Sequence, residues 1–251
     1  MATYKKRGTK PKKNIEEKST TAGVFNTLDE SASKTEAWIA KNQNIIFGVV
    51  GGIAVIVLGF FAYQQFIKKP KETEAATEMA QAQVYFSDAL DSTDAAVQDS
   101  LYVLALNGNS SNLGFLNIIE DYSGTDAANL ARYYAGMAYL KTGKYKNAIS
   151  YLDQFKSDDE LLAPLAVGAI GDAFMQLEQP EQAISYYEKA SSMRENSFTT
   201  PKFLLKAAIT AIELKQGEKA EKHLTELEEN YPDSPEAEKT AIYMGIAKSI
   251  K

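Results

Sequence analysis

The sequence predicts an all-α protein in which a single transmembrane helix precedes an α-solenoid of paired helices. An apolar run of 23 residues without charge lies at 45–67, near the N-terminus. Beyond it, apolar residues recur at intervals of three and four, and one pattern returns after 35 residues. Apolar residues at these intervals line one face of a helix, and a pattern that repeats every roughly 20–50 residues is typical of solenoids.

The residue composition argues against catalysis. The chain has no cysteine, which excludes disulfides, thiolate nucleophiles and cysteine-ligated zinc or iron–sulfur sites. Its single histidine, His223, lies in an amphipathic helical run beside Lys222, so we expect a solvated helix residue rather than a catalytic base. The sequence has no Gly-x-Ser-x-Gly, Gly-rich phosphate-loop or His-Glu-x-x-His motif. We therefore expect a protein that is not an enzyme and that holds no cofactor or metal.

Residues 1–26 are expected to form a disordered basic tail. The net charge is +4 over residues 1–44 and −10 over residues 45–251. The first 20 residues are poor in large apolar side chains, so they cannot bury enough surface to offset the entropy lost on ordering. The basic cluster Lys5–Lys13 suits contact with anionic membrane lipid or with ribosomal RNA, or serves only as a solvated topology signal. Apart from such ribosome proximity, we expect no nucleic-acid partner.

Residues 27–44 are expected to form a short amphipathic juxtamembrane helix. Thr27 and Glu30 fit a capping box at its start. Leu28, Trp38 and other apolar residues follow at roughly helical spacing. This helix either lies on the inner membrane surface or continues into the span.

Residues 45–67 are long and apolar enough to form the transmembrane helix. At about 1.5 Å per residue, these 23 residues cover roughly 30 Å of hydrocarbon. Trp38 and Tyr63 lie near the two ends, and Lys68 and Lys69 follow the run, as interfacial aromatics and flanking lysines do in spanning helices. A cleaved signal peptide has a shorter apolar core that lies nearer the start of the chain.

The charges that flank the span leave its orientation open. Within twenty residues of the span, Lys34 and Lys41 lie upstream, whereas Lys68, Lys69 and Lys71 lie downstream. These flanks slightly disfavour a cytoplasmic N-terminus, but the whole tail is basic, and long domains translocate largely regardless of charge. We expect a single-pass protein of a bacterial inner membrane, with a cytoplasmic N-terminus and a periplasmic C-terminal domain.

A pair of glycines inside the span is a candidate contact between membrane helices. Gly48 and Gly52 form a Gly-x-x-x-Gly pattern, and small residues four apart let a second helix approach closely. Glycine is also simply common in membrane helices, so the alternative of no specific contact remains open.

The domain at 68–251 contains three registered copies of one repeat. The residues around Gly136 match those around Gly171 at an offset of 35, and a third copy follows after an insertion of two residues. A unit of about 34 residues with two helices and a turn is the tetratricopeptide repeat. Small residues recur where the two helices of a unit cross, and large residues recur between successive units: Gly136, Gly171, Ala208, Ala148, Ala183 and Ala220 are small, and Tyr139, Phe174, Leu152, Tyr187 and Leu224 are large.

Helices are also expected on both sides of the repeats. Residues 73–90, 97–106 and 113–122 show helical spacing of apolar residues, with a loop at 108–111. The last helix is expected at Ser234–Ile250, where it caps the solenoid toward solvent.

The first helices of such a stack line its concave side and supply a candidate protein-binding groove. Methionine and tyrosine in a groove suit adaptable binding of extended or helical segments. Each of these residues has ordinary core packing as its alternative role. The candidates in this register are Tyr133, Met137, Leu140, Lys141, Asp172, Met175, Gln176, Leu205, Ile209 and Glu213.

The chain resembles the YfgM family, which supplies ancillary subunits of the bacterial Sec translocon. The resemblance rests on a lysine-rich tail, one membrane helix and a C-terminal tetratricopeptide domain, and on the stretches at 19–43 and 122–153, which are similar to Bacteroidota members. It implies a helical domain in the periplasm and partnership with the SecY–SecE–SecG channel and with PpiD, a membrane-anchored periplasmic chaperone. No binding residue can be transferred, because the family has no motif that matches position by position.

Two functions follow as hypotheses. The first is a membrane-anchored protein-binding subunit of the Sec translocon, which assists the periplasmic handling of secreted client polypeptides as a chaperone or scaffold. The alternative is a membrane-tethered tetratricopeptide scaffold for envelope assembly or cell division. Co-purification from gently solubilised membranes separates them, because Sec subunits accompany the chain in one case and cell-wall or division proteins in the other.

Overall fold

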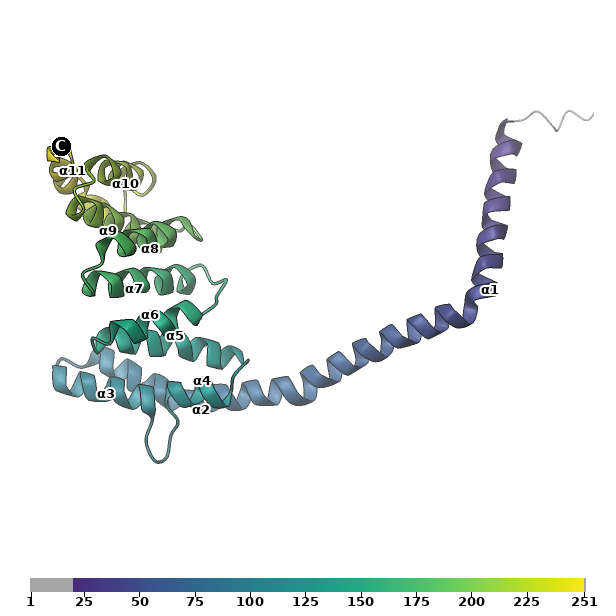
Figure 1. Cartoon of the computed structure of the whole chain (residues 1–251), viewed down its shortest axis with the longest axis horizontal. Helices are drawn as coiled ribbons and strands as arrows, with labels where there is room; N and C mark the ends of the chain where they lie inside the picture. The colour runs from purple at the N-terminus through teal and green to yellow at the C-terminus, as the bar shows by residue number, and fades with distance from the viewer. Residues whose placement is uncertain (1–19, 251) are drawn as a thin grey trace, which may run out of the picture. The chain divides into compact units, whose positions relative to one another are not determined.

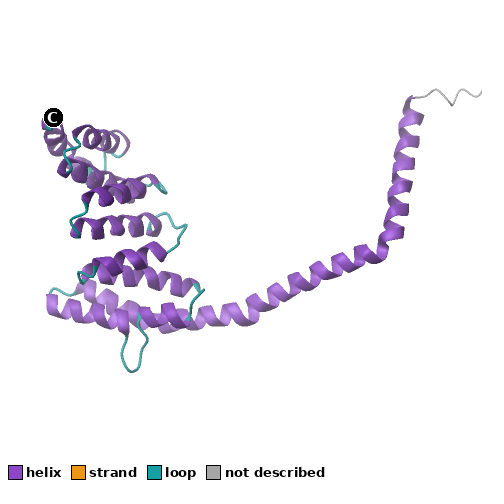
Figure 2. Cartoon of the chain, viewed as in Figure 1, coloured by secondary structure: helices purple, strands orange, loops and turns teal. Residues whose placement is uncertain are grey.

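The computed structural model describes residues 20–250, which fold into helices joined by short loops (Figure 1). The described part of the chain contains no β-strand (Figure 2), and the all-α prediction is confirmed. An isolated bridge pairs Gly108 with Leu113 across the loop predicted at 108–111. Most of the predicted basic tail, with its cluster Lys5–Lys13, lies outside the described residues. The chain divides into two units between Gln64 and Gln65, and each unit is described by itself.

The described residues of the first unit form one helix, α1 (Thr20–Tyr63). Among residues 20–250, its apolar stretch is the one that is long and apolar enough to cross a membrane, and no other part of the described chain buries it. This length and composition are compatible with a single-pass membrane anchor. The helix begins seven residues before Thr27, so residues 20–26 are helical and do not belong to an irregular tail. The predicted juxtamembrane helix and the span are parts of one continuous helix.

Three helices precede the repeats. A π-helical turn (Gln64–Lys68) leads into α2 (Lys69–Asp91), followed by α3 (Ala95–Asn107) and α4 (Phe115–Asp121). These bounds confirm the three helices predicted in this region. The side chain of Asp94 accepts hydrogen bonds from the first amides of α3 and so caps that helix.

An aromatic cluster joins these helices to the first repeat. The ring of Phe86 on α2 meets Tyr102 edge-on at 5.4 Å and Tyr134 at 5.2 Å between ring centroids. Phe115 on α4 stacks on Tyr134, with ring centroids 5.2 Å apart. Such pairs contribute about 0.5–1.5 kcal/mol each beyond the area that they bury, so α2 to α4 form part of the solenoid core.

Three antiparallel helix pairs follow and confirm the predicted repeats. Figure 1 shows the pairs stacked one on another. In each pair the earlier helix is called the first helix and the later one the second helix. The pairs are α5 (Asp126–Lys141) with α6 (Tyr145–Gln154), α7 (Leu162–Gln176) with α8 (Pro180–Ser192), and α9 (Thr199–Glu213) with α10 (Gly217–Asn230).

The turn inside each pair has the same backbone conformation. Gly143, Glu178 and Lys215 occupy equivalent positions, and their φ angles are 72°, 57° and 59°. The residue after each one donates its backbone N–H to a carbonyl five residues earlier, which closes the end of the first helix. Glycine adopts this left-handed conformation without strain, whereas a side chain there costs about 1–2 kcal/mol.

Small residues lie where the two helices of a pair cross, as the repeat pattern predicts. A Cβ added at Gly136 would lie 2.5 Å from Leu152 Cγ, and one added at Gly171 would lie 2.6 Å from Cε1 of Tyr187. In the third pair the corresponding residue is Ala208, which is fully buried. The second helices can therefore lie close against the first helices only where no side chain, or a methyl group, stands between them.

The last helix of the described residues is α11 (Thr240–Ser249), preceded by a 3-10 turn (Ala237–Lys239). The last helix is therefore shorter than predicted and begins after Ser234. It packs against α9 and α10 through the buried residues Thr240 and Ala247.

Candidate functional site

The ten predicted groove residues all lie on the first helices α5, α7 and α9. We call the exposed and half-exposed members of this set the first-helix surface. Lys141, Gln176 and Glu213 are exposed, and six others are half-buried. The half-buried residues are Tyr133, Met137, Leu140, Asp172, Met175 and Ile209.

Leu205 differs from the other candidates because it is a core residue. Its side chain is 6% exposed and packs within the cluster formed by α8, α9 and α10. Tyr133, at the equivalent position of the first repeat, keeps part of its ring exposed and meets Phe155 with ring centroids 5.4 Å apart. Leu205 therefore has the alternative role of core packing, and the first-helix surface consists of the other nine candidates.

Asp172 in the middle of this surface is held by two neighbours. The hydroxyl of Tyr187 on α8 donates to Asp172 Oδ1 at 2.7 Å, and Lys206 on α9 forms an ion pair with the same oxygen. Burial and the carboxylate of Asp172 raise the pKa of the Tyr187 hydroxyl well above its usual value, so this group stays a donor. These contacts join the second and third repeats.

The amide of Gln176 is the second member of the surface that makes an internal contact. Its Oε1 accepts a hydrogen bond of 3.2 Å from the hydroxyl of Tyr145 at the start of α6. The apolar members Met137, Met175 and Ile209 lie one on each first helix and are partly exposed. They are the side chains of this surface best suited to pack against an apolar partner segment.

The structure contradicts the expectation that His223 is solvated. The residue is 8% exposed, and its Nε2 lies 3.0 Å from Glu188 Oε1 on α8. Lys219 Nζ lies 3.1 Å from the same oxygen. Burial acts to raise the pKa of Glu188, but the hydrogen bonds from Lys219 and His223 outweigh it and hold this pKa below its ordinary value.

The position of His223 in the fold explains its burial. The Glu188 contact joins α8 to α10, which are the second helices of successive repeats. Its other ring nitrogen, Nδ1, is buried and has no hydrogen-bond partner within the described chain. Because a carboxylate only accepts hydrogen bonds, Nε2 carries the proton of the Glu188 contact. His223 therefore has a structural role, because it joins the second helices of two successive repeats.

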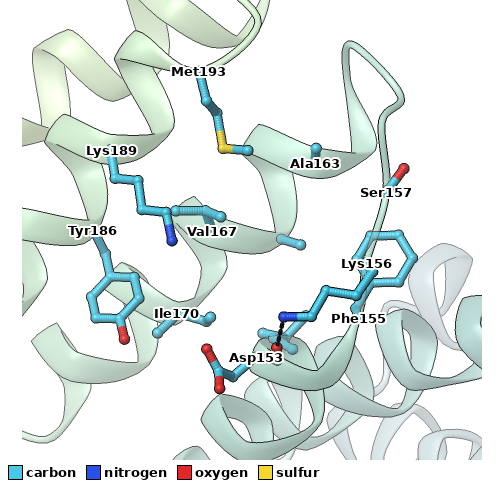
Figure 3. Close-up of a pocket in the computed structure, with 12 residues that line it drawn as sticks. Asp153, Phe155, Lys156, Ser157, Ala163, Val167, Ile170, Tyr186, Lys189 and Met193 are labelled. Atoms are coloured by element: carbon cyan, nitrogen blue, oxygen red, sulfur yellow. Dashed lines mark hydrogen bonds between the residues drawn. The ribbon is translucent and has the colours of Figure 1, made fainter.

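Sequence reasoning also missed a cavity of about 160 Å³ between α6, α7 and α8 (Figure 3). Its lining includes the apolar side chains of Phe155, Val167 and Ile170. Lys156 and Lys189 also line it; Lys156 donates to the backbone oxygen of Asp153 at 2.9 Å. The lining residues come from two adjacent repeats, so periodicity within one helix could not have revealed the cavity.

The first turn of α2 holds the start of the first repeat. The carboxylate of Glu72 accepts hydrogen bonds from the backbone amides of Asp126 and Ala127, at 2.7 and 2.8 Å. Tyr122 donates to Glu74 at 3.2 Å. Because a carboxylate at a helix N-terminus satisfies free amides, Glu72 acts as a cap for α5 that comes from another helix.

Within residues 20–250, no group of three His, Cys, Asp or Glu side chains is placed to hold a metal ion. The solenoid offers its helix surfaces and this small cavity for recognition.

Comparison with known families supports the repeat assignment. Two sequence profiles, each described as tetratricopeptide repeat, match the chain, one at residues 166–197 and the other at 130–159 and 203–234. These segments coincide with the pairs α7–α8, α5–α6 and α9–α10. Neither profile describes a catalytic family, and tetratricopeptide proteins are typically non-enzymatic scaffolds. No curated protein and no solved structure shows significant similarity to the chain.

Proposed function

Because residues 130–234 carry tetratricopeptide repeats, we propose that this chain is a membrane-anchored protein-binding subunit whose first-helix surface holds partner segments. Tetratricopeptide repeats indicate a role in protein–protein interaction. The observation that supports the choice of surface is the row of partly exposed apolar side chains, Met137, Met175 and Ile209, with one on each first helix. Flexible thioethers adapt to varied apolar partners, which suits capture of unfolded segments.

The contact of Glu72 with α5 supports a role close to the membrane. Only four residues separate Glu72 from Ile67, the last residue of the proposed span, and Glu72 caps the first repeat directly. A partner held by the repeats then stays near the membrane surface. More specifically, we propose that the chain associates with the SecY–SecE–SecG channel and with a PpiD-like chaperone, and that its clients are secreted polypeptides. This part rests on the resemblance to the YfgM family.

The surface is tested by changing Met137, Met175 and Ile209 together to serine. We expect reduced photo-crosslinking of the full chain to an unfolded secretory precursor, because the apolar contact area is lost while the repeats stay folded. The control is a triple alanine variant at Ser150, Ser185 and Lys222, which are exposed and occupy one equivalent position on the three second helices. Unchanged capture by a folded serine variant would refute the assignment of this surface.

Co-purification from gently solubilised membranes tests the identity of the partners. Enrichment of Sec channel subunits with the full chain supports the translocon role. Enrichment of cell-wall or division proteins without Sec subunits instead supports an envelope scaffold. The serine triple variant should keep the membrane-anchored association with the channel while it loses client capture, which separates the two kinds of contact.

A further inference from the structure

Helix α11 occupies the place of the first helix of a fourth repeat. Gly171 and Ala208 are the small crossing residues of the second and third repeats and lie 37 residues apart. The same interval after Ala208 leads to Gly245 in α11. Moreover, α11 packs against α9 and α10, just as α9 packs against α7 and α8. In residues 20–250, no second helix follows α11.

Within residues 20–250, one face of α11 is open. In α9, Leu205 and Ala208 are 6% and 0% exposed, because α10 lies against this helix. At the equivalent positions of α11, Ile242 is 67% exposed, and Gly245 is also exposed. A Cβ added at Gly245 would meet nothing within 4 Å. The equivalent Cβ at Gly171 would lie 2.6 Å from the ring of Tyr187.

The open face is apolar, although the terminal helix of a solenoid ordinarily turns a polar face to water. Ile242 and Ile246 are four residues apart and exposed, and the small residues Ala241 and Gly245 lie beside them. The second helices of the complete repeats show what covers such a face. Each of them presents a small residue and, four residues later, a large one: Ala148 and Leu152, Ala183 and Tyr187, Ala220 and Leu224.

We propose that α11 of a second copy of this chain covers this face and forms a two-fold dimer. The helix itself carries two small residues, Ala241 and Gly245, each directly followed by a large one, Ile242 and Ile246, so it offers both the gaps and the side chains that can fill them. It is therefore complementary to itself, as a two-fold interface requires. Residues 236–239 carry a net charge of −1, and the other end of the helix carries Lys248. An antiparallel pair brings these opposite charges together.

Crosslinking tests this dimer, because the natural chain has no cysteine. A single Gly245→Cys substitution in the full chain, treated in its membrane with a short bismaleimide, should give a covalent homodimer. The control, Thr225→Cys, places an exposed cysteine on α10, away from the open face, and should stay largely monomeric. Equal dimer yields from the two variants would overturn the proposal, as would a Gly245→Cys product whose mass shows a different protein.

Two further variants identify the surface that makes the dimer. Ile242→Asp with Ile246→Asp, added to Gly245→Cys, should abolish the crosslink without changing the melting temperature, because both isoleucines are exposed. Gly48→Leu with Gly52→Leu should leave the crosslink intact. A crosslink that survives the aspartates, or one that is lost with the leucines, would show that α11 does not hold the two copies together.

Discussion

Gly168→Ala should destabilise the solenoid, although alanine is the better helix former. A Cβ at this position of α7 would lie 1.9 Å from Cε1 and 2.1 Å from Cζ of Phe203 on α9. Carbon atoms pack at about 3.5–4.0 Å, so one of the two helices must move by roughly 1.5 Å. Phe203 has little freedom to move, because it is 1% exposed and its ring stacks on Tyr187.

The size of the effect follows from two opposing contributions. Overpacking a core costs about 1–3 kcal/mol, whereas replacing glycine by alanine inside a helix gains up to about 1 kcal/mol. We expect a net loss of about 1–2 kcal/mol for Gly168→Ala. At about 2–4 °C per kcal/mol for a domain of this size, the melting temperature falls by roughly 2–8 °C.

Thermal unfolding of the full chain in detergent, followed by far-ultraviolet circular dichroism, measures this loss. The matched control is Gly59→Ala, also within a helix, where an added Cβ meets nothing within 4 Å and the melting temperature should hold or rise. Phe203→Leu should partly rescue Gly168→Ala, because it removes the ring that the new methyl group strikes. A melting temperature of Gly168→Ala at or above that of the natural chain, or no coupling with Phe203, would refute this packing.

Five other outcomes are expected. Carbonate extraction should leave the chain in the membrane pellet, and recovery in the supernatant would refute the membrane anchor. For the orientation, protease added to spheroplasts should digest the C-terminal domain and spare an N-terminal tag. Glu72→Ala should cost about 0.5–2 kcal/mol and speed amide exchange at the start of α5, whereas Glu78→Ala should do neither. The pKa of Glu188 is lowered in the folded chain, so the ionised carboxylate stabilises the fold above the ordinary pKa of 4.5. This stabilisation is lost as the pH falls through the lower pKa of the folded chain, and Glu188→Gln should therefore lose less stability on acidification. Lys215→Gly should raise stability by about 1 kcal/mol by relieving its left-handed backbone, with Gly143 as the precedent.

The sequence alone was sufficient to predict the helices and their pairing. Hydrophobic periodicity is a property of each helix by itself, and the offset of 35 residues places the small crossing residues Gly136 and Gly171 in register. The long uncharged run likewise identifies the candidate membrane helix of residues 20–250 without reference to any contact. These features depend on the order of residue types along the chain and not on contacts between helices.

The tertiary structure decided which polar and small side chains find partners. The contacts of Glu72 with α5 and of His223 with Glu188 join residues more than thirty positions apart, so no local pattern reveals them. Gly168 differs from these residues because comparison of the repeats could have revealed it: the equivalent positions hold the large residues Tyr133 and Leu205. The stacking of successive repeats brings these groups together, and the structure also shows that Ile242 and Ile246 of α11 are exposed.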